Sequence, residues 1–254
     1  MRKLLLAALA ALLTAGSAGA IINGEPDGNR HPYVAAIGFI DAATGKPGKF
    51  CTGTLISPTV IVTAGHCTKP SVAAFVWFDE QFDSRKPPAA IGMPVTHPDF
   101  KADMTLPNTG DLGVVLLNRP IVMATYGALP KAGYLEDLGR KRGHELGVSI
   151  VGYGAQSLDP FIPPGMRMLG KARIQNLNSS FVRDYGLKVS GVNGSGRSGS
   201  CLGDSGGPIL HDDSNVVVAV HSFGDVDTCE GANYAYRTDS ASARAFLGRF
   251  VPLP

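Results

Sequence analysis

One eight-residue stretch, CLGDSGGP at residues 201–208, constrains this chain more than any other. Its Ser205 stands between glycines, directly after Asp204 and three residues before Pro208. Glycine adopts backbone conformations that other residues avoid, so nearby amide groups can point at one ligand. Acyl-transfer enzymes need a nucleophilic hydroxyl beside such N–H donors. The stretch is also compatible with an ordinary turn, so a catalytic role requires a base, an acid and a cleft from the rest of the chain.

The first twenty residues have the pattern of a secretory signal peptide. Arg2 and Lys3 are positive, residues 4–13 are apolar, and Ala20 ends a small-residue segment at a cleavage position. The apolar run is shorter than the ~20 residues that a membrane-spanning helix needs. We therefore expect a secreted protein that loses residues 1–20 and does not associate with a membrane.

The remaining chain is electrically balanced. The full sequence has 23 Lys+Arg and 21 Asp+Glu, and the predicted signal peptide removes two bases and no acid. A formal charge of zero gives no reason to expect binding to nucleic acid. The 32 glycines and 18 prolines among 254 residues are typical of a turn-rich globular protein.

Four cysteines in an exported chain predict two disulfides. Three pairings are possible. Pairing Cys51 with Cys67 and Cys201 with Cys229 would close loops of moderate length, each worth about 3 kcal/mol in the chain-entropy model. Zinc is the competing interpretation, but no two of these cysteines have Cys-x-x-Cys spacing.

Short strand-like segments dominate the rest of the sequence and predict an all-β barrel or sandwich. We expect one helix, residues 239–250, capped by Asp239 or Ser240. Residues 118–147 are rich in Gly, Pro and charge and are interpreted as a crossover between two halves, and residues 156–165 as an exposed loop. The predicted strands are 33–40, 50–63 broken at Ser57 and Pro58, 72–78, 112–117, 148–151, 168–174, 187–189, 208–211 and 216–222.

Two further residues have the chemistry that a serine nucleophile needs. His66 lies in the motif TAGHC directly after a predicted strand and beside Cys67. A neutral imidazole there can take the proton of a serine hydroxyl and return it to a leaving amine. Asp111 lies at the entrance to an apolar strand, where a buried carboxylate needs a partner such as an imidazole N–H.

The order His66, Asp111, Ser205 and the motifs around them resemble the chymotrypsin/trypsin family of serine proteases. The resemblance covers nearly all of residues 21–250, including IING at 21–24, GTLI at 53–56 and GYG at 152–154. It implies two antiparallel six-stranded β-barrels with the active site between them and a C-terminal helix. The expected domains are residues 21–130 and 131–254.

The resemblance also implies a role for each motif residue. Ser205 would be the nucleophile, His66 the general base and acid, and Asp111 the group that orients the imidazole. The backbone N–H groups of Gly203 and Ser205 would form the oxyanion hole. Ser222 would donate a hydrogen bond to the triad carboxylate.

Members of this family are usually activated by cleavage that creates a new ammonium group, which pairs with the aspartate before the nucleophile. Here those groups are Ile21 and Asp204. Because Ala20 precedes Ile21, removal of the signal peptide itself could expose the activating terminus. Cleavage after Ala15 is the alternative and leaves a propeptide of residues 16–20.

The specificity pocket departs from the tryptic pattern. Gly199, followed by Ser200, stands where trypsin-like members have the aspartate that binds Lys or Arg. Two preferences stay open. One is an apolar or small side chain in a neutral pocket. The other is glutamate, which the resemblance to a glutamate-cleaving branch of the family implies, because His221 and Ser200 match the histidine and the Ser/Thr that receive the substrate carboxylate there. The resemblance implies that the segment containing Ser222, Phe223 and Gly224 contacts an extended substrate.

The function expected is therefore that of a secreted serine endopeptidase, expected to be monomeric and to need no cofactor or metal. Its partners would be protein or peptide substrates and proteinaceous inhibitors. The alternatives are a catalytically silent secreted homologue that acts as a binding module, and an esterase. The esterase is disfavoured because no βαβ pattern surrounds Ser205.

Overall fold

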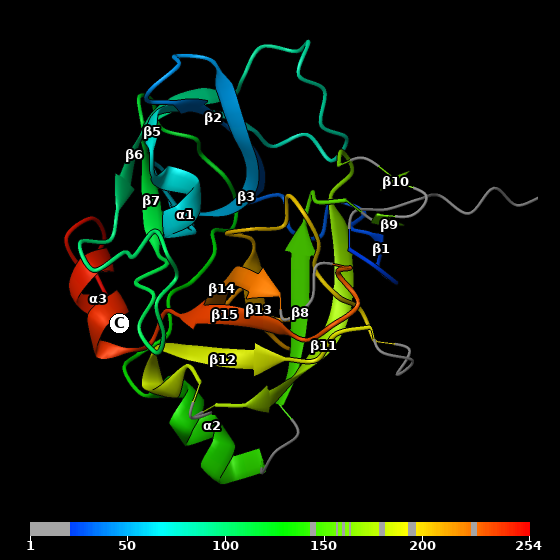
Figure 1. Cartoon of the computed structure of the whole chain (residues 1–254), viewed down its shortest axis with the longest axis vertical. Coiled ribbons are helices and arrows are strands. Elements are labelled where there is room, and N and C mark those ends of the chain that lie inside the picture. The colour runs from blue at the N-terminus through cyan, green and yellow to red at the C-terminus, as the bar shows by residue number, and fades with distance from the viewer. Residues whose placement is uncertain are drawn as a thin grey trace, which may run out of the picture.

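Two barrels of antiparallel strands stand one above the other in the computed structural model (Figure 1). The structure describes residues 21–142, 146–155, 157–158, 161–162, 164–177, 181–192, 197–224 and 228–254. The predicted signal peptide lies outside these residues. No helix in the described part of the chain is both long enough and apolar enough to cross a membrane.

The first barrel contains six strands in the order β2-β3-β4-β7-β6-β5, and pairing of β5 with β2 closes it. The strand predicted over residues 50–63 is interrupted as expected, since β3 ends at Ser57 and β4 begins at Val60. Strand β6, which the sequence did not predict, completes the barrel between β5 and β7. The strands are β2 (Val34–Asp41), β3 (Pro47–Ser57), β4 (Val60–Thr63), β5 (Ser71–Trp77), β6 (Ala90–Thr96) and β7 (Gly113–Leu117).

The second barrel is also closed and six-stranded. Strand β8 pairs with both β11 and β13, which joins the two ends of the order β11-β12-β15-β14-β13-β8. Strand β15 was not predicted. The strands are β8 (Leu146–Gly152), β11 (Met168–Asn176), β12 (Gly186–Val189), β13 (Pro208–His211), β14 (Val217–Gly224) and β15 (Asn233–Arg237). The predicted fold of two six-stranded barrels is thus confirmed.

The chain ends cross between the barrels and tie them together. Near the start, β1 (Glu25–Pro26) pairs with β11 of the second barrel. At the other end, α3 (Ala241–Leu247) packs against the first barrel, where the rings of Phe246 and His97 lie 5.0 Å apart. Each barrel is therefore held by a segment that is distant from it in sequence.

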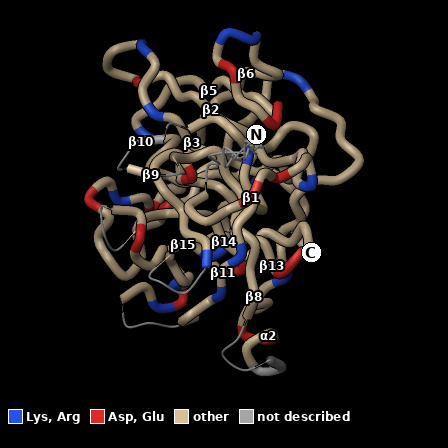
Figure 2. The backbone as a smooth tube through the Cα atoms, turned by 90° about the vertical axis from the view of Figure 1, so that its right-hand side faces the viewer, with Lys and Arg blue, Asp and Glu red and all other residues tan. Residues whose placement is uncertain are grey.

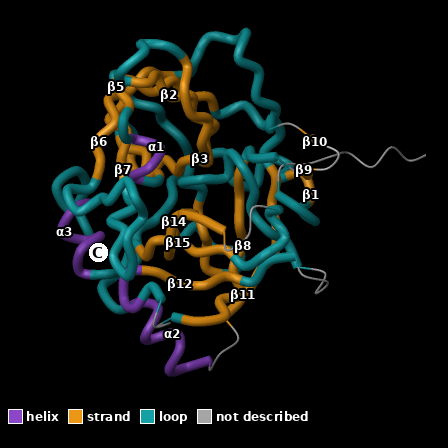
Figure 3. Tube along the Cα trace, in the orientation of Figure 1, coloured by secondary structure: helices purple, strands orange, loops and turns teal. Residues whose placement is uncertain are grey.

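The predicted C-terminal helix is confirmed, with Ser240 as its N-cap: its Oγ accepts a hydrogen bond from the Ala243 N–H at 3.3 Å. The prediction of a single helix is wrong. The crossover segment contains α2 (Tyr134–Arg142), which lies at the bottom of the molecule in Figure 3, below the strands of the second barrel. Helix α2 depends on a distant contact, since Asp239 Oδ2 accepts the Leu135 N–H at 2.9 Å. The other helical segments are α1 (Gly65–Thr68) and the 3₁₀ turn η1 (Arg183–Tyr185).

The segment 156–165, predicted to be an exposed loop, contains two short strands. Its described residues form a short antiparallel pair, β9 (Ser157–Leu158) with β10 (Phe161–Ile162).

A buried arginine joins the two barrels. The Arg167 side chain is fully buried, and its Nε donates to Asp27 Oδ2 at 3.0 Å. Its Nη1 donates to the Phe78 carbonyl at 3.1 Å and to the Tyr153 hydroxyl at 2.9 Å. His31 also contacts Asp27, through Nδ1 at 2.6 Å. Because the guanidinium has several N–H groups to satisfy, one side chain fixes strands of both barrels and the N-terminal segment.

Charged residues of both signs are interspersed over the described chain and do not collect on one barrel (Figure 2). The overall field of the molecule therefore offers little selectivity among ligands. Recognition must come from local groups at a site.

Candidate active site

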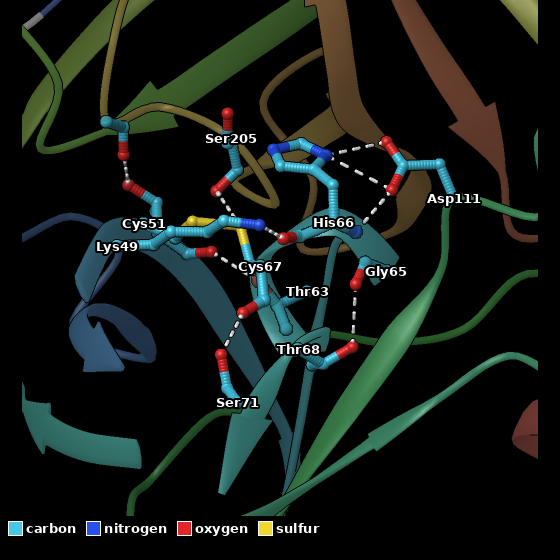
Figure 4. Close-up of a disulfide and its surroundings, with 12 residues drawn as sticks. Lys49, Cys51, Thr63, Gly65, His66, Cys67, Thr68, Ser71, Asp111 and Ser205 are labelled. Carbon is cyan, nitrogen blue, oxygen red and sulfur yellow. Dashed lines mark hydrogen bonds and ion pairs between the residues drawn. A yellow bond between two sulfur atoms is a disulfide. The ribbon is translucent and has the colours of Figure 1, made fainter. Parts of the chain in front are cut away.

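His66 and Asp111 come from the first barrel. His66 lies on the short helix α1, directly after β4, and Asp111 lies two residues before β7. A disulfide between Cys51 and Cys67 ties α1 to β3 (Figure 4). The backbone of His66 is therefore fixed by β4 on its N-terminal side and by the disulfide of Cys67 on its C-terminal side.

The Asp111 carboxylate is fully buried and accepts hydrogen bonds from several groups. His66 Nδ1 lies 2.9 Å from Oδ2 and 3.1 Å from Oδ1, and the His66 backbone N–H donates to Oδ1 at 2.7 Å. The Ser222 hydroxyl donates to Oδ2 at 2.5 Å. Since Ser222 belongs to β14, this bond crosses from the second barrel to the first. Because Asp111 contacts Nδ1 of His66, the other ring nitrogen, Nε2, is available to a different group.

Ser205 lies on the side of the His66 ring opposite Asp111 (Figure 4). Among the described residues, no hydrogen bond joins Ser205 Oγ to His66 Nε2; hydrogen bonds between catalytic groups often tighten only when substrate binds. The Ser205 backbone is anchored to the first barrel, because its carbonyl accepts the Thr52 N–H at 2.9 Å. The serine therefore stands at the junction of the two barrels.

Gly206 allows this close approach. Its φ of +78° lies in the left-handed region, and a Cβ there would stand 2.0 Å from Thr63 Oγ1 and 2.6 Å from the Ala64 nitrogen. Any side chain would push the Ser205 loop away from the first barrel.

The backbone around Ser205 leaves two N–H groups unused. Neither the Gly203 nor the Ser205 N–H has an acceptor among the described residues, whereas the Asp204 N–H donates to the Cys201 carbonyl at 3.0 Å. Gly203 has a φ of +100°, which L side chains rarely adopt. Unpaired N–H groups beside a hydroxyl are the donors that a developing oxyanion needs, so the predicted oxyanion-hole donors are available.

Asp204 is a second fully buried carboxylate. It accepts the Gly154 N–H at 2.8 Å and the Cys201 N–H at 2.9 Å. Burial raises its pKa to about 7, and these two hydrogen bonds only partly oppose that shift. The close approach of Asp204 explains why the GYG motif has a glycine at position 152, since a Cβ there would stand 2.1 Å from Asp204 Oδ1.

The IING motif is bound to the segment that leads to Ser205. Ile21 is buried in the second barrel, and Ile22 exchanges two backbone hydrogen bonds with Gly199, at 2.9 and 3.1 Å. Gly199 therefore supports the Ile21 segment and is not among the described residues that line the cavity beside Ser205.

That cavity has a volume of about 450 Å³. Leu202 stands exposed at its edge, and the Cys201–Cys229 disulfide contributes to its wall. The two disulfides are Cys51–Cys67 and Cys201–Cys229, which is the pairing of neighbouring cysteines among the three possible pairings. The structure brings together five of the predicted pocket residues as lining residues: Ser200, His221, Ser222, Phe223 and Gly224.

Two residues near the site were not predicted. Asn233 lines the cavity, and its Oδ1 accepts the Ser200 hydroxyl at 2.7 Å. Lys49 Nζ donates to the carbonyls of His66 and Lys69, so it holds the far end of α1. Partial burial lowers the pKa of Lys49, although the nearby Asp111 charge opposes this shift. Neither residue lies in a motif, so only the tertiary contacts identify them.

One cluster has the residue types of a metal site. Ligand atoms of Cys51, His66 and Cys67 lie within 4.8 Å of one another. Both sulfurs are in a disulfide and have no thiolate to offer, so this donor set does not fit a metal ion.

Comparison with known proteins decides the family. The family model described as "Trypsin" matches residues 21–247. The chain belongs to the trypsin family. This confirms the resemblance drawn from the motifs, and it agrees with the two closed barrels.

Two named relatives and one solved structure are similar to this trypsin-family chain. Brachyurin of Leptuca pugilator is 28% identical over 217 residues, which cover 80% of this chain and 85% of that protein. Ovochymase of Halocynthia roretzi is 24% identical over 225 residues, 82% of this chain, but the chain spans only 14% of that protein's length. A structure titled "HL collagenase" has a TM-score of 0.72 over 90% of this chain and 97% of its own, at 20% identity, which supports the fold alone.

Proposed function

We propose that this trypsin-family chain is a secreted serine endopeptidase that hydrolyses peptide bonds through an acyl-enzyme on Ser205. One observation carries the proposal: the chain of contacts from Ser222 through Asp111 to His66, with Ser205 on the free side of the imidazole. Membership of a protease family and the disulfides support an exported enzyme that acts on proteins.

In the proposed mechanism, Ser205 Oγ attacks the scissile carbonyl while its proton passes to His66 Nε2. Asp111 holds the opposite ring nitrogen and stabilises the imidazolium that forms. The oxyanion accepts hydrogen bonds from the free backbone N–H groups of Gly203 and Ser205. The imidazolium then gives its proton to the leaving amine. Water, deprotonated by His66, then attacks the acyl carbonyl, and the imidazolium returns the proton to Ser205 Oγ as the bond between Oγ and the acyl carbon breaks and the carboxylic acid leaves.

Activation would pair a new ammonium at Ile21 with Asp204. Asp204 is fully buried and its pKa is raised in the uncleaved chain, so a cation beside it would stabilise its ionised form. Ala20 makes the signal-peptide cleavage site the proposed source of this terminus. N-terminal sequencing of secreted protein tests it: a start at Gly16 in inactive material would refute direct activation.

The cavity supports a non-tryptic preference. Of the described residues that line it, none is Lys, Arg, Asp or Glu, so these residues offer no fixed anion to a basic substrate side chain. Two preferences at the residue before the scissile bond fit a neutral pocket: an apolar or small side chain, or glutamate.

The proposal is tested by labelling with a fluorophosphonate that reacts with activated serines. Processed wild-type protein should be labelled stoichiometrically and lose its peptidase activity, and Ser205→Ala should be neither labelled nor active. Ser214→Ala, which removes a hydroxyl from a surface turn, is the matched control and should be labelled like the wild type. Failure to label correctly processed wild-type protein would favour the catalytically silent homologue.

A further inference from the structure

One strand, β3, contacts the segments that carry both the proposed base and the proposed nucleophile. The Thr52 N–H donates to the Ser205 carbonyl at 2.9 Å, and the Thr52 hydroxyl donates to the Gly203 carbonyl at 2.9 Å. Three residues earlier on the same strand, the Lys49 ammonium donates to the His66 carbonyl (Figure 4). The placement of His66 relative to Ser205 therefore depends on this short part of β3.

Opposite charges hold the backbone of His66. Its N–H donates to Asp111 Oδ1 at 2.7 Å, while its carbonyl accepts a hydrogen bond from Lys49. The same ammonium donates to the Lys69 carbonyl at 3.0 Å, so Lys49 contacts the C-terminal end of α1 at two points. The last carbonyls of a helix have no partner within it, and an ammonium satisfies them with charge-assisted hydrogen bonds.

Lys49 fixes a part of α1 that the neighbouring disulfide does not contact directly. The disulfide joins Cys51 to the side chain of Cys67, whereas Lys49 binds the main-chain carbonyl of His66 itself. Partial burial lowers the pKa of Lys49, and the charge of Asp111 opposes this shift. The ammonium is therefore attracted to the same carboxylate that contacts the imidazole.

We propose that Lys49 is a positioning residue for proton transfer from Ser205 to His66. By holding the His66 carbonyl, it fixes the imidazole at the distance from Ser205 that the transfer needs. The proposal rests on the proposed function, because it requires these two residues to react. A displacement of about 1 Å between reacting groups can cost about 10²-fold in rate, so loss of this backbone contact should slow the chemical step.

Two substitutions of Lys49 and one control test the proposal. Lys49→Met keeps the length of the side chain but removes its N–H donors, and Lys49→Arg keeps donors for two carbonyls. Lys46→Met is the matched control. It removes the ammonium of an exposed lysine three residues earlier, whose side chain has no hydrogen bond or ion pair with the described residues.

The variants are compared in processed protein with a peptide anilide as substrate. Lys49→Met should lower kcat about tenfold and leave KM unchanged, because the contact positions the base and does not bind substrate. Lys49→Arg should regain most of the wild-type kcat, and Lys46→Met should match the wild type. Fluorophosphonate labelling of Lys49→Met should slow by a similar factor and still reach the wild-type stoichiometry.

Three results would overturn the proposal. One is a wild-type kcat per labelled site in Lys49→Met, with any loss confined to the fraction of molecules that can be labelled, since Lys49 would then only stabilise the fold. Another is a loss of the same size in Lys46→Met. The third is an equal loss in Lys49→Met and Lys49→Arg, which would mean that hydrogen bonds to the two carbonyls are not what the lysine supplies.

The labelling also separates this inference from the proposed function. If Ser205 is labelled in the wild type and Lys49→Met reacts at the same rate, the inference about Lys49 fails and the proposed function stands. If Ser205 is not labelled in processed wild-type protein, the proposed function fails first.

Discussion

The two buried aspartates of the site, Asp111 and Asp204, have the same burial but opposite surroundings. Asp111 contacts an imidazole, a backbone N–H and the Ser222 hydroxyl. Asp204 has two backbone N–H donors, and burial raises its pKa to about 7. The folded chain thus supplies Asp111 with an imidazole partner, whereas Asp204 has no cationic partner among the described residues.

This difference suggests separate tasks for the two barrels. The first barrel carries the proposed acid–base pair, His66 and Asp111, on elements fixed by a disulfide and regular strand pairing. The second carries the proposed nucleophile, Ser205, next to the buried carboxylate of Asp204. If these roles hold, the acid–base pair forms on folding, and the proposed oxyanion site depends on the N-terminus.

The largest effect should come from Asp111→Asn. The amide cannot hold His66 in the tautomer that accepts the Ser205 proton, and the corresponding change in a serine protease lowers kcat about 10⁴-fold. Steady-state kinetics on a peptide anilide measure it. The control is Asp213→Asn, an exposed partner of Lys171, which should retain full activity. Retention of more than a tenth of wild-type kcat in Asp111→Asn would contradict the role assigned to this carboxylate.

Asp204→Asn should have the next largest effect. An asparagine cannot pair with the Ile21 ammonium, and breaking a buried pair on one side costs about 3–5 kcal/mol. Loss of an ordered oxyanion hole should lower kcat about 10²–10³-fold. The measurement needs protein shown by sequencing to begin at Ile21. Wild-type rates from such protein would refute the pairing of Asp204 with the Ile21 ammonium.

The smallest effect should appear in the pH dependence of stability. In a form that begins at Ala20, the folded pKa of Asp204 lies near 7, above the unfolded value of ~3.9. The stability it contributes is then complete below about pH 4 and is lost as the pH rises through 7. Each kcal/mol lost lowers the melting temperature by about 2–4 °C in a chain of this size.

A form that begins at Ile21 is the matched comparison. Its ammonium should lower the Asp204 pKa and flatten this part of the profile. Thermal unfolding of both forms between pH 4 and 8 measures the difference. Identical profiles would mean that Asp204 does not sense the new terminus.

Several predictions from sequence agree with the structure because they depended on local signals. The break between β3 and β4 follows from Ser57 and Pro58, and the cap of α3 follows from Ser240. Helix α2 was missed because its segment looks like a linker and its first turn is held by Asp239, about a hundred residues away. Strand β15 was missed because all of its residues are buried, so its sequence shows no alternation of apolar and polar side chains, and because one of its partners, β12, is a distant segment.

The sequence alone determined the residue types of the site and the family, because motifs such as TAGHC and GDSGGP are short, contiguous runs that can be recognised without knowing the fold. Only the tertiary structure decided which distant groups meet. Ser222 reaches Asp111 across 111 residues, and Asn233 joins Ser200 across 33. Hydrogen bonds of this kind depend on how two barrels close and dock, which no local pattern of residues specifies.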